Sequence, residues 1–167
     1  MAEKIEMWDI LDESGNKTGK FCRCGTKMND GEYHIVVQSW IKNTNDKFII
    51  TKRSPNKFLP NLWECTSGAA IAGEDSLTAA LRETKEEIGL ILNPNKGKIV
   101  HSCKTKDSII DVWLFCEDFD INDVVLQEGE TCDVKLATKD EIQKMLDKGE
   151  FLKRDWMSYI YDMFKKY

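Results

Sequence analysis

Residues 68–90, GAAIAGEDSLTAALRETKEEIGL, constrain this chain more than any other stretch. Their second half predicts a helix from about Leu77 to Ile88, with Ser76 as its N-cap and Gly89 ending it. At about 100° per residue, such a helix presents one stripe to a core and gathers its glutamates on a separate face. The stripe comprises Leu77, Ala80, Leu81, Thr84 and Ile88, and the acidic face comprises Glu83, Glu86 and Glu87, at i, i+3 and i+4.

Carboxylates crowded on one helix face repel one another, so a positive charge has to balance them. Arg82 lies one turn from Glu86 and is close enough to pair with it. A hard divalent cation such as Mg²⁺ or Mn²⁺ prefers oxygen ligands and would balance them as well. A solvated acidic face explains the glutamates alone better. The full spacing is more specific, because at roughly 7% usage per position seven fixed residues coincide about once in 10⁸ random windows.

This spacing resembles the Nudix box, a family motif. Its pattern is Gly, five residues, Glu, seven residues, Arg-Glu, aliphatic, any, Glu-Glu, any, Gly, aliphatic. The one departure is Thr84, where an aliphatic residue is usual; its methyl group can pack while its hydroxyl bonds back to the helix. The matching residues are Gly68, Glu74, Arg82, Glu83, Glu86, Glu87, Gly89 and Leu90.

Nudix enzymes mostly hydrolyse a nucleoside diphosphate linked to another group, X. Metal ions that bridge the diphosphate oxygens neutralise their charge and lower the pKa of a bound water. The resemblance implies that Arg82 holds the glutamates in position, and that Glu74 either pairs with Arg82 or approaches the metal through water. It implies Mg²⁺ or Mn²⁺ as the cofactor, bound by Glu83, Glu86 and Glu87 with help from the Gly68 carbonyl.

Hydrolysis also needs a general base, which in many family members lies on a later loop. The acidic loop at 118–131 offers Glu130 as the first candidate and Glu128 as the second. Glu83 is a rival for the same role. An acidic surface loop without a catalytic role explains either loop residue equally well, because the sequence gives no distance from the box.

Contacts to the diphosphate need cations outside the box. Lys52 and Arg53 end a predicted strand just before it, and Lys57 follows in a loop. Arg53 resembles an arginine that is often found at this point in the family. A solvated strand end explains these residues equally well, because isolated basic residues usually lie on the surface.

Length and charge limit the remaining possibilities. The 167 residues fit one domain, which we expect to be a single Nudix hydrolase domain spanning 1–167. A net charge of −5 without a dominant Lys/Arg block argues against nucleic acid as a partner. No apolar run approaches the ~20 residues that span a membrane, so we expect a cytoplasmic protein with free thiols. Cys22 and Cys24 lack the second Cys/His pair that a zinc site needs.

Strand and helix patterns predict an α+β domain. We expect strands at 6–11, 17–24, 33–41, 47–52, 62–67, 98–104, 109–117 and 134–136, with 47–52 pairing back on 33–41 as a hairpin. Beyond the box helix, we expect helices at 139–147 and 154–165. The resemblance implies the Nudix fold, a mixed β-sheet between helices (α/β/α). The aromatic segment 151–167 could cover a core edge or a partner, which leaves a homodimer open.

From residue 7 to about 141 the chain also resembles the isopentenyl-diphosphate isomerase branch of the family. That likeness rests on Trp8-Asp9-Ile10-Leu11, Gly15 with Thr18-Gly19, His34-Ile35-Val36-Val37 with Ser39-Trp40, Thr51-Lys52-Arg53 and Pro60-Asn61-Leu62-Trp63. In the isomerase an essential Cys precedes the box Gly and a metal-binding His follows it, whereas Ser67 and Ala69 stand here.

Other isomerase positions are also only partly kept. Of two further metal-binding His positions, one matches His34 and the other falls near Lys27. Cys65 lies two residues before Ser67 and would share its strand face, which makes it a weak substitute for the essential Cys.

Isomerisation needs an acid and a base poised on a carbon skeleton, whereas hydrolysis needs the carboxylates and metal that the box retains. We therefore interpret the chain as an isomerase-like Nudix hydrolase acting on a small-molecule diphosphate, with His34 as a core residue. The alternatives are an isomerase and a catalytically silent nucleotide-binding domain. Group X stays open, because substrate choice lies in loops, here 53–60 and 118–131.

Overall fold

The computed structural model describes residues 5–167. Within these residues six strands precede the first helix, three strands follow it and two helices come last, and short 3₁₀ turns lie at 94–96, 121–123 and 155–158. In order, the elements are β1 (Met7–Leu11), β2 (Lys17–Arg23), β3 (His34–Lys42), β4 (Phe48–Arg53), β5 (Trp63–Glu64), β6 (Thr66–Ala69), α1 (Ser76–Ile88), β7 (Gly97–Lys104), β8 (Ser108–Cys116), β9 (Thr131–Ala137), α2 (Lys139–Asp147) and α3 (Tyr159–Lys166).

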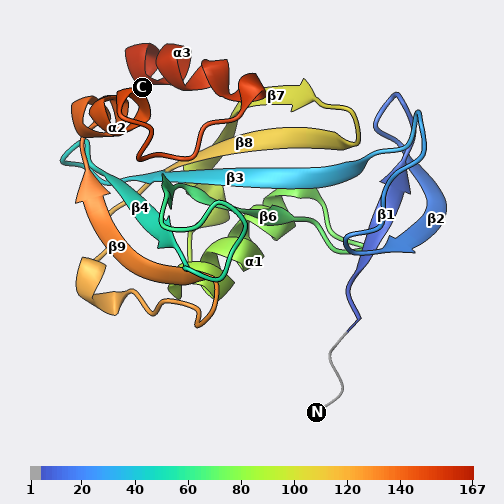
Figure 1. The fold of residues 1–167 in the computed structure, drawn as a ribbon, viewed down its shortest axis with the longest axis horizontal. Coiled ribbons are helices and arrows are strands. Elements are labelled where there is room, and N and C mark those ends of the chain that lie inside the picture. Colours follow the sequence, from blue (N-terminus) through green and yellow to red (C-terminus); the bar gives the residue numbers. More distant parts are fainter. Residues whose placement is uncertain (1–4) are drawn as a thin grey trace.

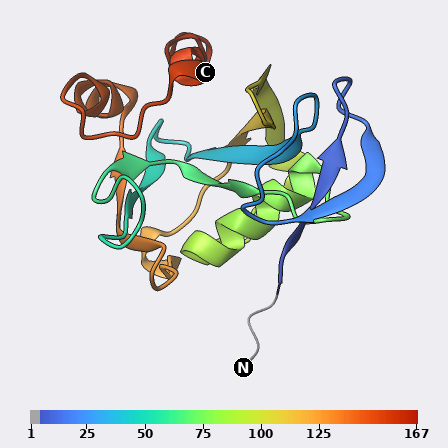
Figure 2. The same ribbon diagram turned by 45° about the vertical axis from the view of Figure 1, so that its right-hand side comes forward.

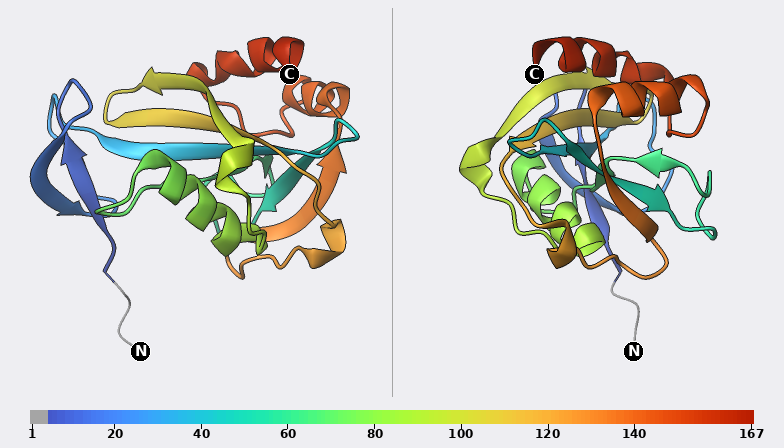
Figure 3. Two further views of the ribbon diagram at one scale, coloured as in Figure 1. Left: turned by 180° about the vertical axis from the view of Figure 1, so that it is seen from behind. Right: turned by 90° about the vertical axis from the view of Figure 1, so that its left-hand side faces the viewer.

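Strand β3 is the centre of the main sheet. It runs parallel to β8 along its whole length, and β7 continues the sheet beyond β8 in the antiparallel direction. On its other side β3 pairs with β6, the strand that leads into the box. Helix α1 covers one face of this mixed sheet and α2 and α3 cover the other (Figures 1 and 3), which confirms the predicted α+β class.

Strands β3 and β4 share only one register pair, Lys42 opposite Phe48. The predicted hairpin therefore exists only at its turn, and β4 instead pairs along its length with β9 and, at its end, with β5. Beyond the turn, β6 takes the place beside β3 that a full hairpin would give to β4. The divergence of β3 and β4 leaves space beside β6, where the box begins.

Side chains alternate across β3 and thereby build two cores. Trp40 lies in the core under α2 and α3, where its ring meets Phe48 edge-on at 5.7 Å between centroids. Val37 and Ile41 face the opposite way and pack with Ala80 and Ile88 of α1. Each fully buried aliphatic side chain of this kind contributes about 1.5–3 kcal/mol. The second core therefore fixes the position of the box helix relative to β3, and the first fixes α2 and α3 on the opposite face.

Helix α1 matches the predicted helix but has a different N-cap. Asp75 caps it by accepting a hydrogen bond from the Thr78 amide at 2.7 Å. The predicted cap, Ser76, is the first helical residue, and its hydroxyl accepts from the Trp113 indole N–H at 2.8 Å. At the other end Gly89 adopts φ 75°, a left-handed conformation that glycine accommodates without strain.

Three further elements differ in length from their predictions. The single strand expected at 62–67 is two short strands, β5 and β6, because the first pairs with β4 and the second with β3. Strand β9 begins three residues earlier than expected, since exposed polar side chains weaken its pattern while its backbone pairs with β4. The expected helix at 154–165 begins as a 3₁₀ turn and becomes α3 only at Tyr159.

Strands β1 and β2 form a separate hairpin beside the main sheet (Figure 2). A bridge between Leu11 and Tyr33 joins this hairpin to the start of β3. The Met7 carbonyl accepts from the Ala72 amide at 2.7 Å, so the hairpin also braces the loop that precedes α1. Among residues 5–167 there is no helix long and apolar enough to cross a bilayer.

Candidate active site

Arg82 is at the centre of the acidic cluster on α1. Its Nε lies 2.7 Å from Glu74, and its Nη1 donates to Glu83 at 3.0 Å and to Glu86 at 2.9 Å. A further bond from Nη2 to the Ala69 carbonyl, at 2.9 Å, ties the helix to the end of β6. Burial alone would lower the pKa of Arg82, but the surrounding carboxylates raise it well above its usual value. The predicted pairing with Glu86 is confirmed, and Glu74 pairs with Arg82.

Glu83 lies directly against the backbone of Gly68. A Cβ atom added at Gly68 would collide with the Glu83 carboxyl group, so a larger residue here would have to displace that carboxyl group. Burial raises the pKa of Glu83 to about 7, with Arg82 opposing the shift and Glu86 adding to it. The predicted box glycine and the first box glutamate of the helix are thus in contact.

Glu87 is the most deeply buried of the box glutamates, with 5% of its surface exposed. Burial raises the pKa of Glu87 well above its usual range, and the neighbouring Glu64 carboxylate raises it further. Among residues 5–167 the Glu87 side chain accepts no hydrogen bond, although its backbone carbonyl accepts from Gln127 at 3.0 Å. A buried carboxylate without a partner is either protonated or balanced by a cation.

The donor set fits a hard divalent cation in its chemistry, because carboxylate oxygens and a backbone carbonyl are what Mg²⁺ and Mn²⁺ bind. As the described side chains lie, however, no group of three His, Cys, Asp or Glu residues converges on one point. Arg82 is the physical reason, since it already bonds two of the carboxylates. Metal binding by Glu83, Glu86, Glu87 and the Gly68 carbonyl therefore stays a prediction.

The structure separates the two loop candidates for the general base. Glu130 forms an ion pair with Lys57, and its charge contributes to the raised pKa of Glu87. Its backbone carbonyl accepts from the Ser54 amide at 3.0 Å, which joins the two loops that flank the cluster. Glu128 is exposed, and its side chain has no hydrogen bond or ion pair within the described part of the chain. Only Glu130 is thus brought to the box; the role itself is untested.

Arg53 is placed differently from the prediction that it contacts phosphate. Its Nη1 donates to both Glu64 oxygens, at 2.9 and 2.8 Å, and its Nε and Nη2 donate to the carbonyls of Phe58 and Leu59. Arg53 is 8% exposed, and each of its three guanidinium nitrogens donates to at least one of these acceptors. Arg53 therefore holds the 54–60 loop in place, and its predicted contact with a diphosphate stays a prediction.

Lys52 does not join the carboxylate cluster either. It is opposite Trp63 in register, with its Nζ 5.8 Å from the Trp63 ring centroid. Strand alternation places it with Ile50 on the face covered by α2 and α3, away from Glu87 and α1. The predicted diphosphate contact by Lys52 stays a prediction.

Glu64 is a candidate site residue that the sequence analysis missed. It is 4% exposed, and burial raises its pKa while Arg53 opposes that shift. Its charge acts on Glu87, so the ion pair with Arg53 belongs to the same electrostatic network. An acidic residue inside an apolar strand pattern is the available signal, because such residues are almost never buried unless they are paired.

A cleft with a volume of about 350 Å³ opens next to the box. Gly68 and Arg53 border it, together with Gln38, Ser67, Arg154 and Trp156. Gly68 connects the cleft with the carboxylate cluster, because it borders the cleft and also touches Glu83. The box glutamates themselves are not part of the cleft lining. A cavity of about 210 Å³ between β9 and α2 has none of the predicted site residues in its lining.

Cys65 and His34, which bear on the isomerase likeness, are packed in the protein interior rather than exposed to a substrate. Cys65 is 1% exposed in the apolar core beneath α2 and α3, where burial raises its pKa well above the usual value and keeps the thiol inert. His34 stacks on Trp8 with 3.8 Å between ring centroids and bonds to Ser108 at 3.1 Å. Burial lowers the pKa of His34, which agrees with a core role.

Comparison with known proteins settles the family. The model of the NUDIX domain matches residues 32–160. The chain belongs to the Nudix family. An uncharacterized Nudix hydrolase of Listeria monocytogenes is 31% identical over 161 residues, covering 95% of each chain. A crystal structure from Deinococcus radiodurans superposes with a TM-score of 0.75 at 20% identity, covering 94% of this chain and 98% of that one.

These matches confirm the Nudix fold and the enzyme class, a pyrophosphohydrolase. The isomerase branch receives less support. An isopentenyl-diphosphate Delta-isomerase of Cutibacterium acnes is 28% identical over 93 residues, which is 54% of this Nudix chain and 47% of that protein. The family is thus established, whereas the branch rests on a distant and partial likeness.

Proposed function

We propose that this Nudix protein is a divalent-metal-dependent hydrolase. It cleaves the diphosphate bond of a nucleoside diphosphate linked to another group, or of a similar organic pyrophosphate, by attack of water at phosphorus. One observation supports this most strongly: Glu83 and Glu87 are buried carboxylates with raised pKa values on one helix, and Glu83 touches Gly68, which borders the cleft. We assign the activity to a single domain spanning residues 1–167.

Glu83, Glu86, Glu87 and the Gly68 carbonyl would hold Mg²⁺ or Mn²⁺. The bound metal would neutralise charge on the diphosphate and lower the pKa of the attacking water. Arg82 positions Glu83 and Glu86 through direct bonds, and its bonds to Glu74 and the Ala69 carbonyl hold the guanidinium in place. It also balances their mutual repulsion when metal is absent.

Glu130 takes the proton from the attacking water in this proposal. Lys57 positions its carboxylate, and the bond from Ser54 to the Glu130 backbone fixes the loop that carries it. Glu83 is the rival base, since burial raises its pKa to about 7 and suits it to accept a proton near neutral pH. The turnover rate of Glu130→Gln distinguishes Glu130 from Glu83 as the base.

Formation of phosphomonoester products with Mg²⁺ or Mn²⁺, separated by chromatography, tests the proposal, because hydrolysis of an X-linked nucleoside diphosphate gives a nucleoside monophosphate and phosphorylated X. The panel contains nucleotide sugars, ADP-ribose, coenzyme A and prenyl diphosphates, each assayed with and without chelator. Hydrolysis that disappears with chelator and with Glu86→Gln supports the proposed site. A prenyl product with a shifted double bond would favour the isomerase alternative, and metal binding without turnover of any compound would favour a silent binding domain.

A further inference from the structure

Three buried polar side chains form a chain of hydrogen bonds between β3 and α3. The Trp40 indole N–H donates to the Tyr159 hydroxyl oxygen at 2.9 Å. The Tyr159 hydroxyl donates in turn to Oε1 of Gln38. Their exposed fractions are 0% for Trp40, 4% for Tyr159 and 5% for Gln38, so water does not compete for these bonds.

The direction of this relay follows from the chemistry of its members. An indole N–H is only a donor, so the Tyr159 oxygen has to accept at its Trp40 side. The Tyr159 proton then needs an acceptor of its own, because a buried hydroxyl without one costs about 1–3 kcal/mol. Gln38 can accept the Tyr159 proton only with its side-chain carbonyl oxygen, because its NH₂ group is a donor. The relay therefore fixes the amide of Gln38, with its NH₂ group directed away from Tyr159.

Gln38 is part of the lining of the cleft that Gly68 borders. Gln38 is paired in register with Ser67, and the next pair along, Val37 with Gly68, includes the box glycine. Within the described residues the only protein partner of the Gln38 NH₂ group is Sδ of Met157 at 4.0 Å, a weak acceptor. At least one N–H of Gln38 is therefore available to a ligand in the cleft.

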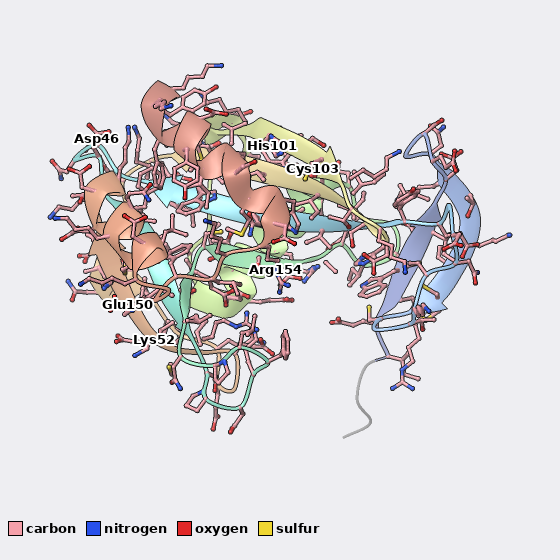
Figure 4. The ribbon with its side chains drawn as sticks, turned by 45° about the horizontal axis from the view of Figure 1, so that its top comes forward. Asp46, Lys52, His101, Cys103, Glu150 and Arg154 are labelled. Carbon is pink, nitrogen blue, oxygen red and sulfur yellow. The ribbon has the colours of Figure 1, made fainter. Side chains whose placement is uncertain are left out.

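Besides Arg53, the cleft lining contains two charged residues, Arg154 and Asp107. The Arg154 side chain, labelled in Figure 4, has no hydrogen bond or ion pair with any residue from 5 to 167. Asp107 also borders the cleft and accepts from the Ser108 hydroxyl at 2.9 Å. A free guanidinium and an amide N–H suit anionic oxygens, whereas a carboxylate suits the hydroxyl groups of a ligand.

We propose that Gln38 and Arg154 determine specificity by binding a phosphate-bearing, hydroxylated part of the substrate in this cleft, and that Tyr159 positions Gln38 for that contact. The inference rests on the proposed function and deepens it, since it makes group X polar and sugar-like rather than a hydrocarbon chain. Tyr159 does not touch the ligand and acts through the amide of Gln38.

Binding of ribose 5-phosphate in metal-free buffer with chelator tests this inference independently of hydrolysis. The ¹⁵N signals of the Gln38 side-chain amide, identified by their loss in Gln38→Leu, report occupancy of the cleft. Ribose 5-phosphate should shift these signals, and 3-methylbutyl phosphate should bind at least about 10-fold more weakly. No shift of the Gln38 signals, or equal affinity for the two probes, would overturn the assignment.

A double-mutant cycle separates positioning from general packing. Tyr159→Phe should weaken ribose 5-phosphate about 5- to 10-fold in the wild-type background and have no further effect on Gln38→Leu. Tyr161→Phe, which removes an exposed hydroxyl from the same helix, is the matched control and should bind normally. Equal losses from Tyr159→Phe in both backgrounds would refute the positioning role. Because no metal or turnover is involved, a failed hydrolase assay leaves this result interpretable.

Discussion

Gly68 and Glu83 touch so closely that a single methyl group placed on Gly68 would overlap the Glu83 carboxyl group. The contact joins β6 to the middle of α1, between two residues that are fifteen positions apart in the sequence (83 − 68). The fixed spacing between Gly68 and Glu83 in the box therefore corresponds to a direct contact between these two residues in the fold. Glu83 is pressed against the backbone whose carbonyl would share its metal.

Gly68→Ala should destabilise the protein by about 1–3 kcal/mol, because overpacking of a filled site forces side chains and backbone to shift. The same change should abolish turnover by displacing Glu83. Urea unfolding of the metal-free protein measures the cost, and Gly68→Ala in a Glu83→Ala background is the control. If the collision is the cause, most of the destabilisation disappears in that background; an equal cost in both would locate the strain elsewhere.

Glu87→Gln should lower metal affinity and turnover without lowering the stability of the metal-free protein. Removing a buried charge relieves an unfavourable desolvation, so the metal-free variant should unfold at the same or a higher urea concentration than wild type. Metal affinity should fall, and turnover should drop by at least ~10²-fold, as with the loss of other charge-stabilising groups. Glu128→Gln, on the exposed loop, is the matched control. Wild-type turnover in Glu87→Gln would contradict the proposed site.

The stability of the metal-free protein should fall as pH rises through the window between the ordinary glutamate pKa and about 7. Glu83 has a folded-state pKa of about 7 and an unfolded value near 4.5, so the folded state binds more protons between these values. Within this pH window each rise in pH favours the unfolded chain. The stability that protonated Glu83 contributes is fully lost above its pKa in the folded protein. Urea midpoints from pH 4 to 8 measure the slope, which should be shallower in Glu83→Gln. A slope unchanged by that substitution would assign the effect to another group.

The sequence predicts the box well because its information is local. Helix periodicity places Arg82 and Glu86 one turn apart, and their ion pair follows from that spacing alone. The cap is ambiguous for a local reason too, since Asp75 and Ser76 are adjacent residues that both favour the N-cap position. Only the packing of Trp113 against Ser76 distinguishes them in the folded chain.

Long-range relationships are what the sequence leaves open. The direction of Arg53 depends on Glu64 across the β4–β5 pairing, and nothing in the strand pattern shows that its donors will be used there. Gln38 and Tyr159 are 121 residues apart, so their relay becomes visible only when α3 lies over β3. Substrate-contacting residues of this type are set by tertiary packing and carry no motif.

Variants of the ion pair between Arg53 and Glu64 distinguish a structural role of Arg53 from a contact with the substrate phosphate. Arg53→Met should destabilise the protein by about 3–5 kcal/mol, because it leaves a buried carboxylate unpaired. Arg53→Met combined with Glu64→Leu removes both charges and should recover most of that loss. Chemical unfolding measures stability, and KM of the double variant measures substrate contact. A stable double variant with wild-type KM supports the structural role, whereas a strongly raised KM would restore the phosphate contact.

Glu130→Gln tests the general base directly. If Glu130 takes the proton from water, kcat should fall by about 10²-fold, within the range for loss of a positioned acid or base, while metal affinity stays unchanged. Lys57→Met removes the ion-pair partner of Glu130 and should lower kcat less, because the carboxylate remains but is less well positioned. Glu128→Gln again serves as the control, two residues away and outside the cluster. Turnover and metal titration are measured on the same samples. An unchanged kcat in Glu130→Gln would transfer the role to Glu83, whose carboxylate already lies against the box glycine and whose raised pKa suits proton transfer near neutral pH.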